Sequence, residues 1–98
     1  MDNLGNRLLK LREERLLTLK KVADVVQINP TLLCRIEKGQ RPATKDQVIK
    51  LARFFNVNEQ SLLTEWLSDK LAGELEGEPV ALKALQLAEE KVKYNTKK

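Results

Sequence analysis

Hydrophobic residues recur along this chain at intervals of three and four positions, which is the spacing of an amphipathic α-helix. Residues 4–15 carry leucines at this spacing, and residues 19–26 would turn Val22, Ala23 and Val26 toward a core. No segment alternates hydrophobic and polar residues over any length, as a half-buried strand does. The pattern therefore predicts an all-α protein.

Capping residues mark where the predicted helices begin and end. Thr18 can cap the helix at 19–26, and Asn29 can cap a third helix. Pro30 fits the first position of that third helix, because the N–H that proline lacks has no helical partner there. Gly39 favours the left-handed backbone with which many helices end. The third helix is therefore short and well delimited.

Two more helices follow from the same signals. Thr44 and Gln47 can form a capping box for a fourth helix that extends to about Phe55. Asn58 would cap a fifth helix that continues to about Leu71. The inward faces of these two helices would carry Val48, Leu51, Ala52, Phe55, Leu62, Leu63, Trp66 and Leu67.

The end of the chain predicts a sixth helix. Gly73, Gly77 and Pro79 interrupt the sequence around AGELEGEP, and Pro79 would open the new helix. One stripe along this helix consists of Val80, Ala81, Ala84, Leu85, Ala88 and Val92. We therefore expect a domain over residues 1–72 and a helical extension over residues 73–98. The extension either packs back on its own domain or pairs with a second copy.

The connection between the second and third helices, residues 26–29, is very short. A connection of this length forces a steep crossing rather than an antiparallel hairpin. Ala23 is small enough for the two helices to approach closely, and Ile28 would fill the core at the turn. This is the helix-turn-helix arrangement, whose second helix lies in the major groove of DNA.

Positive charge is concentrated in the first half of the chain. Residues 1–55 contain 12 Lys and Arg against 6 Asp and Glu, a balance of +6. Residues 56–98 contain 6 against 8, a balance of −2. A basic compact domain favours a polyanionic partner. The alternative on charge alone is an ordinary solvated surface.

The composition argues against an enzyme. The chain has no histidine, which removes the commonest general base and metal ligand. We expect no catalytic residue, no metal, no cofactor and no small-molecule effector. The single cysteine, Cys34, cannot form an internal disulfide, and no apolar run could span a membrane or act as a signal peptide. These features predict a cytoplasmic protein.

Over residues 8–63 the sequence resembles the Cro/C1-type (XRE-like) helix-turn-helix domain of bacterial and phage repressors. The similar stretches are LRE at 11–13, LTLKKVADVV at 17–26, INPTLLCRIEKGQR at 28–41 and VIKLARFFNVNEQSLL at 48–63. The resemblance implies a five-helix domain like that of lambda repressor, to which the sixth helix is an addition. It also implies that the partner is double-stranded DNA.

The resemblance assigns roles to particular positions. Arg12 and Glu37 fall where the family has a buried salt bridge, a structural pair. Base edges would be contacted by four residues of the third helix: Pro30, Thr31, Leu32 and Arg35. The sugar-phosphate backbone would be contacted by Thr18, Leu19, Lys20, Lys38 and Arg41.

Two departures from the family change the expected mode of reading. Leu19 stands where the family often has glutamine, and leucine cannot hydrogen-bond a phosphate. Arg35 is the one residue of the third helix that could make a bidentate contact to guanine, while Thr31 could reach a base or a phosphate. Pro30 and Leu32 offer apolar contact alone. We therefore expect specificity to depend on half-site spacing and DNA shape.

Several of these residues have a second interpretation. Cys34 could be a redox sensor, but a lone cysteine is more often a small hydrophobic residue. Leu32 could contact a base or lie half-buried against the second helix, and Leu19 could belong to the core. Arg41 could bind a phosphate or be a solvated loop charge, and Trp66 could lie in the core or in a dimer interface.

Two functions follow from these observations. The first is a sequence-specific transcription regulator, such as a repressor, that binds a palindromic operator as a homodimer. Its dimer interface would comprise Trp66, Ala81, Leu85, Ala88 and Val92. The second is a protein-interaction module that keeps the fold without reading DNA, which the apolar Leu19, Leu32 and Cys34 suggest.

Overall fold

The computed structural model describes residues 3–96, and within that range it contains six helices and no strand. The all-α prediction is confirmed. The helices are α1 (Leu4–Glu14), α2 (Leu19–Val26), α3 (Pro30–Glu37), α4 (Lys45–Phe55), α5 (Glu59–Leu75) and α6 (Ala81–Thr96). In the same range, none of the helices has the length and hydrophobicity needed to cross a bilayer.

The predicted capping residues determine where the helices begin. The Thr18 hydroxyl accepts a hydrogen bond from the Lys21 N–H, and the Asn58 side chain accepts one from Ser61. At α4, Thr44 and Gln47 form the reciprocal capping box. Side-chain oxygens of this kind satisfy N–H groups that have no partner inside the helix. The sequence signals for these helix starts are therefore confirmed.

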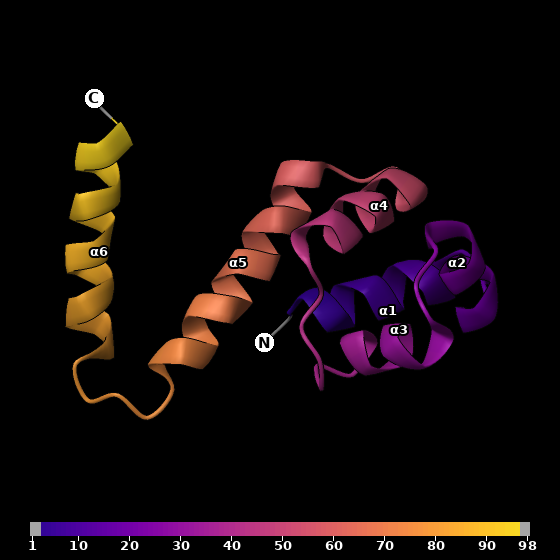
Figure 1. The fold of residues 1–98 in the computed structure, drawn as a ribbon, viewed down its shortest axis with the longest axis horizontal. Helices are drawn as coiled ribbons and strands as arrows, with labels where there is room; N and C mark the ends of the chain where they lie inside the picture. The colour runs from indigo at the N-terminus through magenta and orange to yellow at the C-terminus, as the bar shows by residue number, and fades with distance from the viewer. Residues whose placement is uncertain (1–2, 97–98) are drawn as a thin grey trace.

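Helices α1 to α5 enclose one hydrophobic core (Figure 1). The fully buried side chains come from all five helices, since Leu8, Val22, Leu33, Phe55 and Leu62 each have almost no exposed surface. Ile28 fills the core from the α2–α3 turn, as predicted. We call this five-helix unit the head.

Helix α1 approaches the end of α3 without an intervening side chain. A Cβ atom added to Gly5 would lie 2.6 Å from the carbonyl oxygens of both Ile36 and Glu37. Real Cβ atoms do not come so close to backbone oxygens. Glycine at this position is therefore what allows the first turn of α1 to lie against the last turn of α3.

Three details of the helix boundaries differ from the prediction. Helix α5 continues through Gly73 to Leu75, because an exposed glycine in a helix is a modest cost rather than a stop. The predicted domain limit after residue 72 thus falls inside this helix. Helix α6 begins at Ala81 rather than at Pro79, which lies in the turn. Helix α1 ends one residue early, and Leu16 after it is 92% exposed with a φ of 55°.

Helix α6 stands apart from the head (Figure 1). None of its residues is buried. The radius of gyration is 15.4 Å, whereas a compact domain of this length would have about 13 Å. In this single chain, the extension therefore does not pack back on its own domain.

Candidate nucleic-acid interface

The turn between α2 and α3 fixes the angle at which α3 leaves the head. Gln27 takes a left-handed backbone with a φ of 59°, and the Ile28 N–H donates to the Ala23 carbonyl at 3.0 Å. Ala23 is buried where the two helices meet. The chain therefore changes direction within three residues, as a helix-turn-helix requires.

The start of α3 is exposed and its backbone donors are already paired. The Asn29 side chain accepts hydrogen bonds from the N–H groups of Thr31 at 2.8 Å and Leu32 at 3.4 Å. Pro30 has no N–H to offer. Contacts from this end of α3 to a ligand therefore have to come from side chains, and the side chains of Pro30 and Thr31 are exposed.

The buried face of α3 determines which side chains remain outside. Leu33, Ile36 and Glu37 face the core. Arg35 is exposed on the opposite side, while Leu32 and Cys34 are intermediate. Leu32 packs against the core cluster. The exposed surface of α3 is thus more polar than its sequence suggests, because Leu32 is partly covered.

The end of α3 places two further cations beside this surface. Gly39 has a φ of 75°, and the Gln40 N–H donates to the Arg35 carbonyl at 2.9 Å, so the helix ends in the left-handed way that was predicted. Lys38 at this end and Arg41 in the following loop are both exposed.

The residues at the start of α2 do not all resemble phosphate ligands. Lys20 is exposed, and the Thr18 hydroxyl is used as a cap. Leu19 is only partly exposed and packs against the core cluster. Thr18 and Lys20 are therefore exposed at the start of α2, whereas Leu19 contributes mainly to packing.

Arg12 and Glu37 form a two-pronged salt bridge between α1 and α3. Arg12 Nε donates to Glu37 Oε2 at 2.8 Å and Nη2 donates to Oε1 at 3.1 Å, while Nη1 donates to the Leu17 carbonyl at 3.0 Å. Glu37 is only 6% exposed. The hydrogen bonds to Glu37 raise the pKa of Arg12 above its ordinary value, despite the opposing effect of burial. The pair joins α1, the α1–α2 connection and α3.

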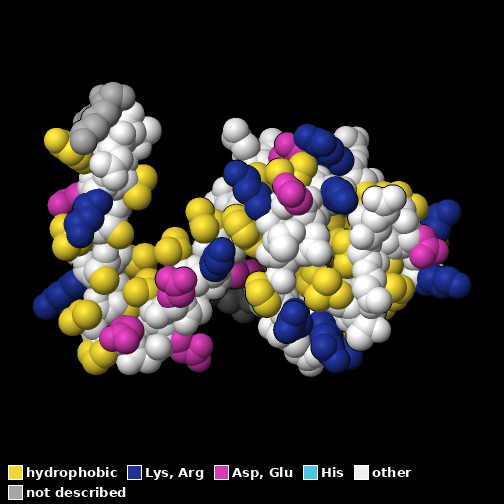
Figure 2. Space-filling model, in the orientation of Figure 1, with side chains coloured by type: hydrophobic (Ala, Val, Ile, Leu, Met, Phe, Trp, Pro, Cys, Tyr) yellow, Lys and Arg dark blue, Asp and Glu magenta, His cyan; other side chains and the backbone are white. Residues whose placement is uncertain are grey.

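The exposed cations around α3 are available for an external anion. Lys20, Arg35, Lys38 and Arg41 have no ion-pair partner among residues 3–96. In Figure 2, Lys and Arg side chains are spread over the head, and Asp and Glu gather where α5 turns into α6. Phosphate groups of a nucleic acid are the ligands that such a distribution favours.

The residues expected at a dimer interface lie in two different places. Trp66 packs against the core of its own head, and its indole N–H donates to the Ala43 carbonyl at 2.7 Å. Ala81, Leu85, Ala88 and Val92 lie on α6, where Leu85 is 38% exposed and Val92 is 64% exposed. Leu67 and Leu71 near the end of α5 are also about half exposed.

Sequence reasoning missed a group of polar contacts between α1 and α5. Arg7 Nη1 donates to Ser61 Oγ at 2.9 Å and to Glu65 Oε1 at 3.0 Å, and the Leu4 N–H donates to Asp69 Oδ2 at 2.9 Å. The spacing of Ser61, Glu65 and Asp69, four residues apart on one predicted helix, was the available signal. No pattern in the sequence indicates that α1 faces them.

Within residues 3–96, no three His, Cys, Asp or Glu side chains lie close enough together to hold a metal ion.

Comparisons with known proteins agree with this geometry. The model of a family described as a helix-turn-helix domain matches residues 5–66. No curated protein matches the chain significantly in sequence.

Two solved structures are similar in fold. One is the clp gene regulator ClgR from Corynebacterium glutamicum, with a TM-score of 0.58 and 22% identity over 93% of this chain and 83% of that one. The other is a chain of the SinR protein/SinI protein complex, with a TM-score of 0.58 and 19% identity over 97% of this chain and 99% of that one. Because the family model covers well over half of the sequence, the chain belongs to the helix-turn-helix domain family of the Cro/C1 (XRE-like) type.

Proposed function

We propose that this protein is a DNA-binding transcription regulator that binds a palindromic operator as a homodimer and reads the major groove with α3. The observation that carries the proposal is the exposed side of α3. It presents Thr31 and Arg35, and the neighbouring segments carry the exposed cations Lys20, Lys38 and Arg41, which have no ion-pair partner among residues 3–96. An α-helix fits the major groove, and cations beside it can neutralise the phosphates on either side.

The roles on α3 follow from what each side chain can reach. Arg35 is the one long donor in the middle of the exposed face, so it is the candidate for a bidentate contact to guanine. Thr31 lies one turn earlier, beside Pro30, and would contact a base or a phosphate. Lys38 and Arg41 lie past the end of the helix, where they would contact the backbone and add affinity without sequence preference.

The alternative of a protein-interaction module rested on the apolar character of Leu19, Leu32 and Cys34. Two of these residues, Leu19 and Leu32, pack against the hydrophobic core. Their presence is therefore explained by packing and does not require a protein partner on the α3 surface. This favours DNA as the ligand of that surface.

The exposed apolar surface of α5 and α6 supports dimerisation. Leu67 and Leu71 on α5 and Leu85 and Val92 on α6 are all more than a third exposed. In Figure 2, hydrophobic side chains line the facing sides of α6 and the distal half of α5. Contiguous exposed apolar surface of this kind marks an interaction site in a soluble protein. A second copy would cover both helices at once, and it would supply the two-fold symmetry of a palindrome.

One of the structurally similar chains is taken from a complex of SinR with a second protein, SinI. A different partner protein is therefore the competing occupant of the α5–α6 surface. Sedimentation of the purified chain distinguishes the two, because a homodimer forms without any added partner.

The experiment that tests DNA reading begins with selection from a random duplex library. The selected sequence is then titrated by fluorescence anisotropy against a scrambled duplex. We expect Arg35→Ala to lose about 1–3 kcal/mol on the selected sequence and to relax its preference at one base pair. Lys83→Ala, which removes an exposed cation from α6, is the matched control and should leave affinity and preference unchanged. Failure of the wild type to enrich any sequence would contradict the proposal.

The dimer is tested with two leucines of α6. Leu85→Asp places a charge in the predicted interface. Leu82 is 77% exposed and lies on the side of α6 that also carries Gln86, so Leu82→Asp places the same charge outside that interface. Leu85 is 38% exposed in the single chain, so a dimer can gain about a third of the ~1.5–3 kcal/mol that full burial of a leucine contributes. Two copies then contribute about 1–2 kcal/mol, and Leu85→Asp should raise the dissociation constant at least about tenfold. Leu82→Asp should remain dimeric. Equal behaviour of the two variants in sedimentation would place the interface elsewhere.

A further inference from the structure

Helix α5 belongs to the head over only part of its length. Leu62 is its one buried residue, and Leu63 and Trp66 pack against the core. Beyond Trp66, Leu67 and Leu71 are about half exposed. The second half of α5 therefore projects from the head and leads directly to α6 (Figure 1).

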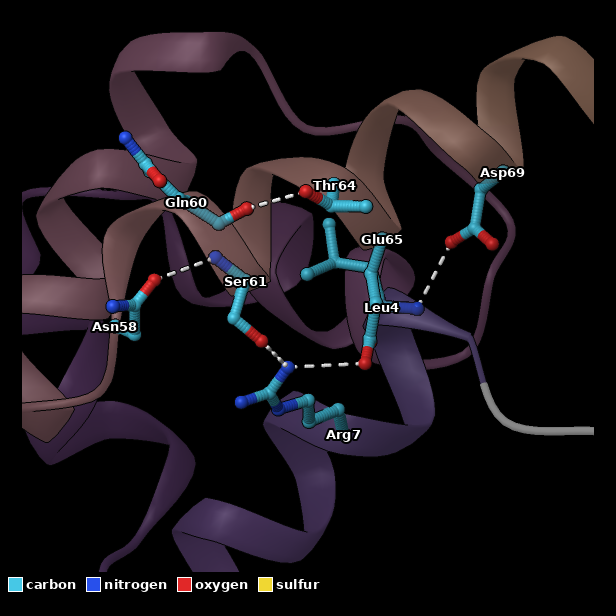
Figure 3. A network of polar contacts seen from close by, with 8 residues as sticks. All are labelled: Leu4, Arg7, Asn58, Gln60, Ser61, Thr64, Glu65 and Asp69. Carbon is cyan, nitrogen blue, oxygen red and sulfur yellow. Dashed lines mark hydrogen bonds and ion pairs between the residues drawn. The ribbon is translucent and has the colours of Figure 1, made fainter.

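A row of polar contacts ties this projecting helix to α1. Ser61, Glu65 and Asp69 are spaced four residues apart and lie on one face of α5 (Figure 3). The first two accept hydrogen bonds from Arg7 at 2.9 and 3.0 Å, and Asp69 accepts one from the Leu4 N–H at 2.9 Å. We call these three acceptors the α5 polar row. Asp69 is its outermost member and, among residues 3–96, the last side chain of α5 with a hydrogen bond to the head.

Close packing does not set the angle of α5 at that point. A hollow of about 370 Å³ separates this stretch of α5 from the loop that follows α3, with Gly39, Arg41, Asp69 and Lys70 among its lining residues. On the side of that loop, the Trp66 indole donates to the Ala43 carbonyl. In the distal half of α5, beside this hollow, the hydrogen bond from the Leu4 N–H to Asp69 is therefore the directional contact with the head among the described residues.

Glu65 retains a feature that stability alone would not favour. Its Oε1 pairs with Arg7, but its Oε2 is buried and accepts no hydrogen bond among the described residues. A buried carboxylate oxygen without a donor is a cost to the folded state. We therefore attribute to Glu65 the geometry that its Oε1 imposes between α1 and α5 rather than added stability.

We propose that Glu65 and Asp69 are positioning residues that set the distance between the two reading helices of the dimer, and therefore the half-site spacing that the protein accepts. The inference rests on the proposed function. The projecting half of α5, Leu67–Leu75, is about 13 Å long, so a tilt of about 10° moves its far end by about 2 Å, and the same tilt in both copies changes the separation of the heads by about 4 Å. One base pair rises about 3.4 Å. A small change in the angle of α5 is therefore enough to bring the two heads out of register with the DNA.

The main experiment compares the preferred half-site spacing of full-length variants. Asp69→Ala removes the outermost acceptor, Asp69→Asn keeps an acceptor in the same place, and Lys83→Ala removes an exposed charge from α6 as the control. Each variant is titrated on the selected palindrome, on palindromes with one base pair inserted or deleted, and on an isolated half-site.

We expect the wild type to prefer its own spacing by about tenfold or more, since a shifted half-site loses its contacts. Asp69→Ala should reduce this preference to about threefold or less, with half-site affinity within about twofold of the wild type. Asp69→Asn and Lys83→Ala should retain the full preference. An unchanged preference in Asp69→Ala, or a loss confined to half-site affinity, would overturn the inference.

A second experiment does not depend on DNA. A spin label on Lys38→Cys, in a chain that also carries Cys34→Ser, reports the distance between the two heads by pulsed double-resonance spectroscopy. We expect a narrow distance distribution that broadens in Asp69→Ala and also in Ser61→Ala, which removes one acceptor of Arg7 without changing a charge. A distribution that stays narrow in both variants contradicts the inference. The absence of any dipolar coupling would instead show that the proposed homodimer is wrong, and the inference would fail with it.

Discussion

The salt bridge between Arg12 and Glu37 can be tested by replacing its members with methionine, singly and together. The pair makes two hydrogen bonds of 2.8 and 3.1 Å, and Glu37 is 6% exposed. Methionine has a comparable length and no charge, so Arg12→Met leaves the buried carboxylate of Glu37 without a partner. It also removes the donor to the Leu17 carbonyl.

The expected magnitude follows from this burial. An uncompensated buried charge costs about 3–5 kcal/mol of the free energy of unfolding, so Arg12→Met should lose about 4 kcal/mol. Glu37→Met should lose somewhat less, because the Arg12 side chain is 18% exposed and can turn toward water. The double variant leaves no charge unpaired, and we expect its stability to lie within about 1 kcal/mol of the wild type.

Thermal and urea unfolding, followed by circular dichroism at one fixed protein concentration, measure these differences. For a domain of this size, 4 kcal/mol corresponds to a fall in Tm of about 15–30 °C. The informative quantity is the coupling energy, which is the stability loss of the double variant minus the sum of the losses of the two single variants. A double variant that loses as much as the two single variants combined would refute the reasoning. The two side chains would then contribute independently rather than as a pair.

Three further substitutions test particular features of the structure. Leu16→Gly should stabilise the protein by about 1 kcal/mol in the same unfolding assay, because Leu16 is exposed and holds a left-handed φ that glycine adopts without cost; a loss of stability would contradict this. Gly5→Ala should destabilise by about 1–2 kcal/mol, since its Cβ would meet two carbonyl oxygens of α3. Gly73→Ala should stabilise α5 slightly, because a Cβ at this position meets no other atom. Equal effects on stability at Gly5 and Gly73 would contradict the close approach of α1 to the end of α3. Arg41→Ala should weaken binding to all duplexes alike and lower the salt slope by about one, and an unchanged slope would exclude a phosphate contact.

The local structure of the head could be predicted from the sequence because its signals act over a few residues. Asn29 followed by Pro30, and Gly39 at the other end, define α3 without reference to the rest of the chain. The errors occurred where a local signal was weak. Gly73 does not end α5, and α6 begins only after Pro79 and Val80. A glycine is compatible with a helix whose two neighbouring turns are favourable, so its position alone does not decide where the helix stops.

The candidate site was partly predictable. The exposure of Thr31, Arg35 and Lys38 follows from the burial of Leu33 and Ile36 on the other side of a short helix. The partial covering of Leu19 and Leu32 could not be read from spacing, because it depends on how α2, α3 and the core meet. The contacts of the α5 polar row could not be predicted either, because they depend on how α1 and α5 meet, and Arg7 and Ser61 are separated by more than fifty residues in sequence.

If α6 pairs with a second copy as we propose, its separation from the head makes its secondary structure depend on protein concentration. An isolated helix of 16 residues is only marginally stable in water, and α6 buries no residue within its own chain. Below the dissociation constant of the dimer, the last sixteen helical residues therefore lose the contacts that would keep them folded. Dilution should lower the helix content of the protein and expose a chain end to proteases. The dissociation constant would thereby set a lower limit to the concentration at which intact protein accumulates.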